Sequence, residues 1–145
     1  MAGVFALNPK ADFMRVGYLG AGTWGFCLAN HLAENGHEVV LWTISEELAN
    51  RLNAYGDHPN LMGVRKANGV HVTHKIREAL AGAEMVVEGV TSAGIRPVFG
   101  QVKEIGVPDC PIVLTSKGIE QHTGLLLGEV LVQVWGKSIA TRLAA

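Results

Sequence analysis

The feature that most constrains this chain is a glycine-rich turn, GAGTWG at residues 20–25. An apolar run that is typical of a buried strand ends at this turn, and a helical pattern begins directly after it. In that setting Gly20 allows a tight turn, Gly22 lets the backbone approach a pyrophosphate, and Gly25 lets the helix and the strand pack closely. The free N–H groups and the dipole at the helix start favour an anion. The turn therefore predicts the phosphate loop of a dinucleotide-binding domain of the Rossmann type.

The rest of the chain alternates between strand and helix patterns. Apolar runs predict strands at 14–20, 37–43, 70–73, 84–90 and 111–116, with one more expected at 138–145. The segments between them predict helices at 24–35, 45–54, 75–81, 92–105 and 123–135. Strands that are apolar throughout are typical of a parallel sheet covered on both faces. Right-handed crossovers then give a Rossmann-like, doubly wound sheet in a three-layer αβα architecture.

Composition fits one such domain and excludes several other classes. The 145 residues are 48% hydrophobic and 17% charged, which is enough apolar material for a core. A net charge of −1 gives no basic surface for nucleic acid. No apolar run approaches the ~20 residues of a membrane span, and residues 1–13 do not resemble a signal peptide. Cys27 and Cys110 are too far apart for a metal motif, so we expect reduced thiols and a cytoplasmic protein.

The histidines do not indicate a metal site. No pair of them has the spacing of metal ligands, and neither cysteine lies near one at such a spacing. We therefore expect no metal, and surface or capping positions for all six histidines, which are His31, His37, His58, His71, His74 and His122.

The end of the second expected strand leaves the choice of cofactor open. Domains that select NAD usually carry Asp or Glu there, which would repel a 2′-phosphate. This chain has Thr43, Ile44 and Ser45 instead, with hydroxyl groups that suit either cofactor. Arg51 lies one or two helical turns further on, where it either reaches the ribose or stays on a solvated helix face. The lack of a carboxylate favours NADP slightly over NAD. Ser45 is also a good N-cap for the following helix.

Four stretches resemble the N-terminal half of the bacterial-type NAD(P)-dependent glycerol-3-phosphate dehydrogenases. They are GAGTWG with Leu28-Ala29 after it, NGHEVVLW at 35–42, EGVTS at 88–92, and TSKGIE at 115–120 followed by Thr123-Gly124-Leu125. The last stretch is the most specific, and the similarity runs from about Arg15 to Gly136. The stretch 60–63 resembles the family's Asn-x-Tyr-Leu-Pro-Gly region with tyrosine and proline missing. Thr91 also replaces a common proline.

The resemblance implies hydride transfer between sn-glycerol 3-phosphate and NAD(P), with dihydroxyacetone phosphate as the ketone, feeding glycerophospholipid synthesis. It places Thr23 and Trp24 at the cofactor, and Lys117 at both cofactor and substrate. Ile44 stands where the family often has a histidine or arginine near the adenosine ribose. The position of Lys117 after a central strand agrees, because ligands of such sheets bind at the carboxyl ends of strands.

Two polar residues at the fourth strand have more than one interpretation. Ser92 either caps the following helix or borders the nicotinamide side of the cleft. Glu88 interrupts an apolar strand near its carboxyl end, and a buried unpaired carboxylate is costly. Glu88 therefore either meets a hydrogen-bond donor or faces the cofactor groove.

In this family the catalytic base is a lysine of a C-terminal helical domain, which also supplies most dimer contacts. We expect that domain beyond Ala145, so residues 1–145 would be the cofactor domain of a longer, homodimeric dehydrogenase, with no catalytic base and little turnover of their own. Two alternatives stay open. One is another two-domain dehydrogenase of the 6-phosphogluconate, 3-hydroxyacyl-CoA or ketopantoate type. The other is a non-catalytic nucleotide-binding module.

Overall fold

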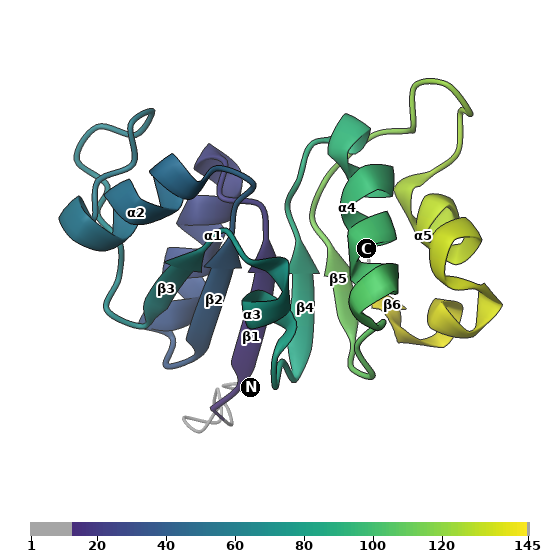
Figure 1. Ribbon diagram of the computed structural model, residues 1–145, viewed down its shortest axis with the longest axis horizontal. Coiled ribbons are helices and arrows are strands. Elements are labelled where there is room, and N and C mark those ends of the chain that lie inside the picture. Colours follow the sequence, from purple (N-terminus) through teal and green to yellow (C-terminus); the bar gives the residue numbers. More distant parts are fainter. Residues whose placement is uncertain (1–12, 145) are drawn as a thin grey trace, which may run out of the picture.

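Six strands form one fully parallel sheet in the computed structural model, which describes residues 13–144 (Figure 1). Their order across the sheet is β3-β2-β1-β4-β5-β6, and every neighbouring pair is parallel. The order reverses between β1 and β4, and a crevice for a ligand opens at such a point beyond the carboxyl ends of the strands. The strands are β1 (Arg15–Leu19), β2 (Glu38–Trp42), β3 (Val70–Thr73), β4 (Met85–Glu88), β5 (Ile112–Leu114) and β6 (Leu143–Ala144).

Helices cover both faces of the sheet, which confirms the expected doubly wound α/β fold (Figure 1). Helices α1 and α2 pack on one face, and α3, α4 and α5 pack on the other. The helices are α1 (Thr23–Glu34), α2 (Glu46–Tyr55), α3 (Ile76–Leu80), α4 (Ser92–Ile105) and α5 (Leu127–Trp135), followed by the 3₁₀ helix η1 (Lys137–Arg142). Within residues 13–144, no helix combines the length and the apolar character needed to cross a bilayer.

Alternation along the strands divides the core into two layers. On β2, Val39 and Leu41 join the layer under α1 and α2, whereas Val40 and Trp42 join the layer under α3 and α4. All four side chains are buried, and each contributes about 1.5–3 kcal/mol when removed from water. Apolar residues on both sides of a strand therefore produce a sheet with both faces covered.

Two expectations near the C-terminus are wrong. The helix expected from residue 123 begins at Leu127, because the Glu129 carboxylate accepts the N–H of Leu126 at 2.8 Å and so caps the helix start there. Gly124, with φ at +71°, belongs to the preceding turn. The strand expected at 138–145 is only the two residues of β6, preceded by η1. The 3₁₀ turn brings Ile139 into the core, where it is 1% exposed.

The contact between α4 and α5 gives a test of the fold. Phe99 is fully buried, its ring packs edge-on against Trp135 at 4.7 Å, and its carbonyl accepts the Trp135 indole N–H at 2.8 Å. We expect Phe99→Ala to lower the free energy of unfolding by about 3–5 kcal/mol, measured by denaturant titration. Tyr55→Ala, at an exposed side chain of α2, should change it by less than about 0.5 kcal/mol. Equal losses in both variants would contradict this packing.

Candidate functional site

The glycine turn lies at the carboxyl end of β1, and its geometry explains why glycine is needed. Gly20 has φ at +116°, and a Cβ on it would lie 2.6 Å from the carbonyl oxygen of Gly89. A Cβ on Gly25 would lie 2.0 Å from the carbonyl oxygen of Gly20, so α1 could not pack against the turn. Gly22 is the N-cap of α1, has no side-chain cap, and leaves open space above its backbone. The first N–H groups of α1 are therefore available to an anion.

His58 contacts the glycine turn, and its position differs from the expectation. The surface position expected for it is wrong, because the side chain is 4% exposed and packs on Phe26 with 5.1 Å between ring centroids. Its Nδ1 accepts the N–H of Asn60 at 3.2 Å, so the proton of the neutral ring is on Nε2, which donates to the carbonyl of Ala21 at 3.1 Å. His58 lies in a loop without periodicity, so no pattern in the sequence could indicate its burial.

One hollow, of about 270 Å³, lies beside the turn. Thr43 and Ile44 line it together with Gly20 and Gly22, and the Ile44 side chain is 80% exposed. Ser45 lies next to it and caps α2, as expected, by accepting the N–H of Leu48 at 3.1 Å. Its hydroxyl proton is still available to a ligand.

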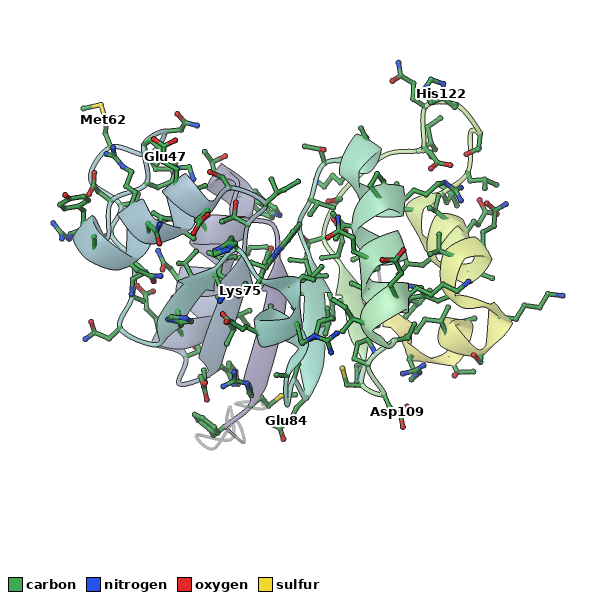
Figure 2. The ribbon with its side chains drawn as sticks, in the orientation of Figure 1. Glu47, Met62, Lys75, Glu84, Asp109 and His122 are labelled. Atoms are coloured by element: carbon green, nitrogen blue, oxygen red, sulfur yellow. The ribbon has the colours of Figure 1, made fainter. Side chains whose placement is uncertain are left out.

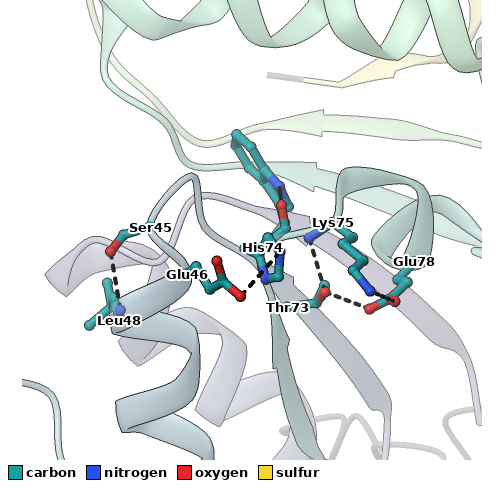
Figure 3. A network of polar contacts seen from close by, with 8 residues as sticks. Ser45, Glu46, Leu48, Thr73, His74, Lys75 and Glu78 are labelled. Carbon is teal, nitrogen blue, oxygen red and sulfur yellow. Dashed lines mark hydrogen bonds and ion pairs between the residues drawn. The ribbon is translucent and has the colours of Figure 1, made fainter.

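Basic side chains around the ends of β2 and β3 lie beside carboxylates. His74 lies 3.9 Å from Glu46, and Lys75 lies 3.7 Å from Glu78, as Figure 3 shows. Arg51 of α2 turns to Asp57 at 2.9 Å, with both side chains about half exposed. Such exposed pairs contribute only about 0–1 kcal/mol, so a bound phosphate could replace the carboxylates.

A second hollow, of about 370 Å³, brings together three residues that were predicted separately. Trp24 of α1, Ser92 at the start of α4 and Lys117 after β5 all line it. Thr91, not Ser92, is the N-cap of α4, and no side chain caps that helix. The expectation that Ser92 acts as a cap is therefore wrong, because the helix already begins at Ser92, one residue earlier than a capping Ser92 requires. Within residues 13–144, no group of histidines, cysteines and carboxylates could hold a metal ion.

The loop that carries Lys117 is held by an ion pair that the sequence analysis missed. The guanidinium of Arg96 on α4 donates to both carboxylate oxygens of Glu120 at 2.7 Å, and Thr123 donates to Glu120 at 2.5 Å. The Arg96 hydrogen bonds lower the pKa of the Glu120 carboxyl to about 2. Glu120 and Thr123 lie within the family-like stretch around Lys117, but only the fold brings Arg96 to them.

This loop lies at the edge of the sheet where ligands of such folds bind. Figure 2 shows His122 and Met62 at the tips of two loops beyond the carboxyl ends of the strands, one on each side of the molecule. Glu84 and Asp109, which precede β4 and β5, mark the opposite edge (Figure 2).

Glu88 meets hydrogen-bond donors, which settles its two interpretations in favour of structural pairing. Its side chain is fully buried, and one carboxyl oxygen accepts the N–H of Val90 at 2.7 Å and lies 2.6 Å from the hydroxyl oxygen of Ser116. Its carbonyl oxygen accepts the hydroxyl of Thr115 at 2.6 Å. Burial raises the pKa of the Glu88 carboxyl, and its hydrogen bonds with the Ser116 side chain and the Val90 backbone oppose this.

Comparisons with known proteins agree with this geometry. A family model described as the N-terminus of NAD-dependent glycerol-3-phosphate dehydrogenase matches residues 15–144. Glycerol-3-phosphate dehydrogenase (NAD(P)+) of Protochlamydia amoebophila is 51% identical over 123 residues, which are 85% of this chain and 37% of that protein. The enzyme of Chlamydia muridarum is 50% identical over 86% of this chain and 37% of its own length. This chain therefore spans little more than a third of these curated relatives.

A solved structure shows the same relation. The crystal structure of glycerol-3-phosphate dehydrogenase from Coxiella burnetii superposes with a TM-score of 0.79 at 25% sequence identity. The match covers 86% of this chain and 38% of that one. The likeness thus extends over nearly all of the present sheet and its helices.

Two helical glycines provide a matched test of the phosphate loop. We expect Gly25→Ala to weaken NADH binding by about tenfold or more, about 1.4 kcal/mol, because the methyl group collides with the Gly20 carbonyl. Gly100→Ala on α4 meets open space, so it should leave binding unchanged and stabilise the helix slightly. Calorimetric titration measures both, and equal affinity in the two variants would contradict the role of Gly25.

The Arg96–Glu120 pair gives a prediction for acid stability. Glu120 has a lowered pKa of about 2 in the folded chain against a usual value of 4.5. Between the two pKa values the unfolded chain therefore binds more protons than the folded chain. The stabilisation from ionised Glu120 is complete above pH 4.5 and is lost as the pH falls toward 2. We expect Glu120→Gln to be less stable than wild type at neutral pH but to lose less stability in acid. Denaturant titrations at several pH values measure this, and Glu104→Gln is the exposed control. Parallel acid profiles for wild type and Glu120→Gln would contradict the pairing.

Proposed function

The chain belongs to the family of NAD-dependent glycerol-3-phosphate dehydrogenases, whose N-terminal region it matches, and on this premise we propose that it binds NAD(P) for the interconversion of sn-glycerol 3-phosphate and dihydroxyacetone phosphate. The observation that carries the proposal is the hollow in which Trp24, Ser92 and Lys117 meet beyond the carboxyl ends of the strands. It adjoins the glycine turn, whose first helical N–H groups suit a pyrophosphate.

Each of these residues has a proposed role. The backbone at Gly20, Gly22, Thr23 and Gly25 receives the pyrophosphate, while Thr43, Ile44 and Ser45 border the adenosine ribose. Trp24 and Ser92 border the nicotinamide, which supplies or accepts the hydride when it is bound. Lys117 holds the substrate, since its ammonium group can bind a phosphate or stabilise negative charge on the oxygen at the reacting carbon.

The choice between NAD and NADP is also a proposal. No carboxylate occupies Thr43, Ile44 or Ser45, so nothing at the end of β2 repels a 2′-phosphate. Arg51, His74 and Lys75 are each in weak exposed pairs that a 2′-phosphate could displace. These features favour NADP slightly, and side-by-side titration with NADH and NADPH decides the preference.

We propose that residues 1–145 act as the cofactor domain of a longer, cytoplasmic and homodimeric dehydrogenase that feeds glycerophospholipid synthesis. The relatives are almost three times as long as the matched region, and the resemblance implies that their remaining part holds the catalytic lysine. A largely apolar hollow of about 670 Å³ beside Ser116 and Gly118 supports this, because such a surface suits cover by further protein. The dehydrogenases of 6-phosphogluconate or 3-hydroxyacyl-CoA are disfavoured by the family match.

The purified chain provides the direct test. We expect it to bind NADH or NADPH, seen by calorimetry and by energy transfer from Trp24, and to reduce no dihydroxyacetone phosphate, because the catalytic lysine lies elsewhere in the relatives. Lys117→Ala should weaken binding of cofactor and substrate, whereas Lys103→Ala, at an exposed position on α4, should change neither.

Either of two results would overturn the proposal. Full turnover by the 145 residues would contradict the proposal that the catalytic lysine lies outside them. Unchanged binding of cofactor and substrate in Lys117→Ala would make this lysine a surface residue. Binding of cofactor by a full-length relative that never turns over would favour a non-catalytic nucleotide-binding module.

A further inference from the structure

The buried carboxyl of Glu88 connects the two loops that form the walls of the hollow lined by Trp24, Ser92 and Lys117, where we place the nicotinamide. Glu88 is the last residue of β4, and its side chain is fully buried directly beneath this hollow. Its oxygen Oε1 contacts the N–H of Val90, which lies in the wall after β4, and the hydroxyl of Ser116, which lies in the wall after β5. The Ser116 hydroxyl also makes a short contact with the carbonyl oxygen of Val90. One side chain thus determines the separation of both walls.

The number of protons available to the contacts of Ser116 indicates whether the Glu88 carboxyl is protonated. The hydroxyl of Ser116 has one proton, but its oxygen lies against two acceptors, Glu88 Oε1 and the carbonyl oxygen of Val90. If Glu88 were ionised, one of these two contacts would bring acceptor against acceptor without a proton between them. If Glu88 is protonated, its O–H donates to Ser116, Ser116 donates to Val90, and every contact contains one proton.

The charged groups around Glu88 do not offer it a cation. Within residues 13–144 the side chain forms no salt bridge. From β1, Tyr18 approaches through Thr115, whose hydroxyl lies 3.4 Å from the phenol oxygen. From α4, Arg96 is engaged by Glu120, and Lys117 in the next loop is exposed at the hollow. A buried carboxyl without a cation favours its neutral form, and burial raises the pKa of Glu88 accordingly.

We propose that Glu88 is a positioning residue that keeps its proton near neutral pH and donates it to Ser116, so that the hydrogen-bond chain Glu88–Ser116–Val90 holds the two walls at the separation that receives the nicotinamide. The part that concerns cofactor binding rests on the proposed function. When Glu88 loses its proton at alkaline pH, its carboxylate can only accept, so the Ser116 hydroxyl turns to donate to Glu88 and no longer to Val90. The contact between Ser116 and Val90 then becomes repulsive, and the walls lose their fixed separation.

Three substitutions separate this role from a merely structural one. Gln at position 88 cannot ionise, and its NH2 group can donate to Ser116 but cannot also accept the N–H of Val90 as Oε1 does. We expect Glu88→Gln to bind NADH more weakly than wild type at neutral pH but to keep its affinity as the pH rises. Wild type should lose affinity by up to about tenfold for each pH unit above the pKa of Glu88. Glu88→Ala should bind weakly at every pH, and Glu104→Gln, at an exposed position on α4, should follow wild type. Lys117 is present in all four proteins, so its contribution to binding is common to them.

Infrared spectroscopy reads the proton without any cofactor. The wild-type chain should keep the carbonyl band of one protonated carboxyl group at neutral pH, lose it in alkali, and lack it in Glu88→Gln. Absence of this band at neutral pH, or an NADH affinity of a folded Glu88→Gln that falls with rising pH as steeply as that of wild type, would overturn the proposal. If Glu88→Gln does not fold, the pH dependence of the wild-type band still decides the proton state. If the wild-type chain binds no dinucleotide, the proposed function fails, while the band independently tests Glu88.

Discussion

The close approach of three glycine backbones around Tyr18 is the constraint on which the site depends. A Cβ on Gly25 would strike the Gly20 carbonyl at 2.0 Å, and one on Gly89 would lie 2.8 Å from the Tyr18 ring. Tyr18 itself is fully buried on β1. Because α1 and the loop after β4 both approach this ring, the distance between the glycine turn and the loop after β4 follows from the absence of two side chains.

Side chains hold the loops beyond these glycines, where the backbone forms no regular hydrogen-bond pattern. His58 donates to the carbonyl of Ala21 in the phosphate loop. Arg96 and Glu120 hold the loop after β5 by two hydrogen bonds of 2.7 Å. Glu88 connects that loop to the one after β4. Loop backbone needs partners of this kind for its polar groups, and here the same contacts hold the binding positions in place. The loops of the site are therefore held by polar contacts from residues outside the proposed binding positions.

Sequence patterns predicted the fold well where periodicity and turn chemistry act locally. The buried strands, the glycine turn and the Ser45 cap each depend on neighbours within a few residues. The start of α5 was wrong by four residues because the apolar spacing continues through the turn at Gly124, and only the contact of Glu129 with the N–H of Leu126 ends it. The strand expected at 138–145 is shorter than predicted, since Ile139 enters the core through a 3₁₀ turn and only Leu143–Ala144 form β6.

The sequence by itself determined the parallel sheet, the phosphate loop and the family, because apolar runs, glycine spacing and the stretch around Lys117 are local signals. It also indicated that Glu88 needed a partner. Only the tertiary structure decided which partners the loops have, since Glu88 with Ser116, Arg96 with Glu120 and His58 with Ala21 are separated by 28, 24 and 37 residues. Contacts at such separations depend on how strands are ordered in the sheet and how loops fold over its edge, and no local pattern encodes either.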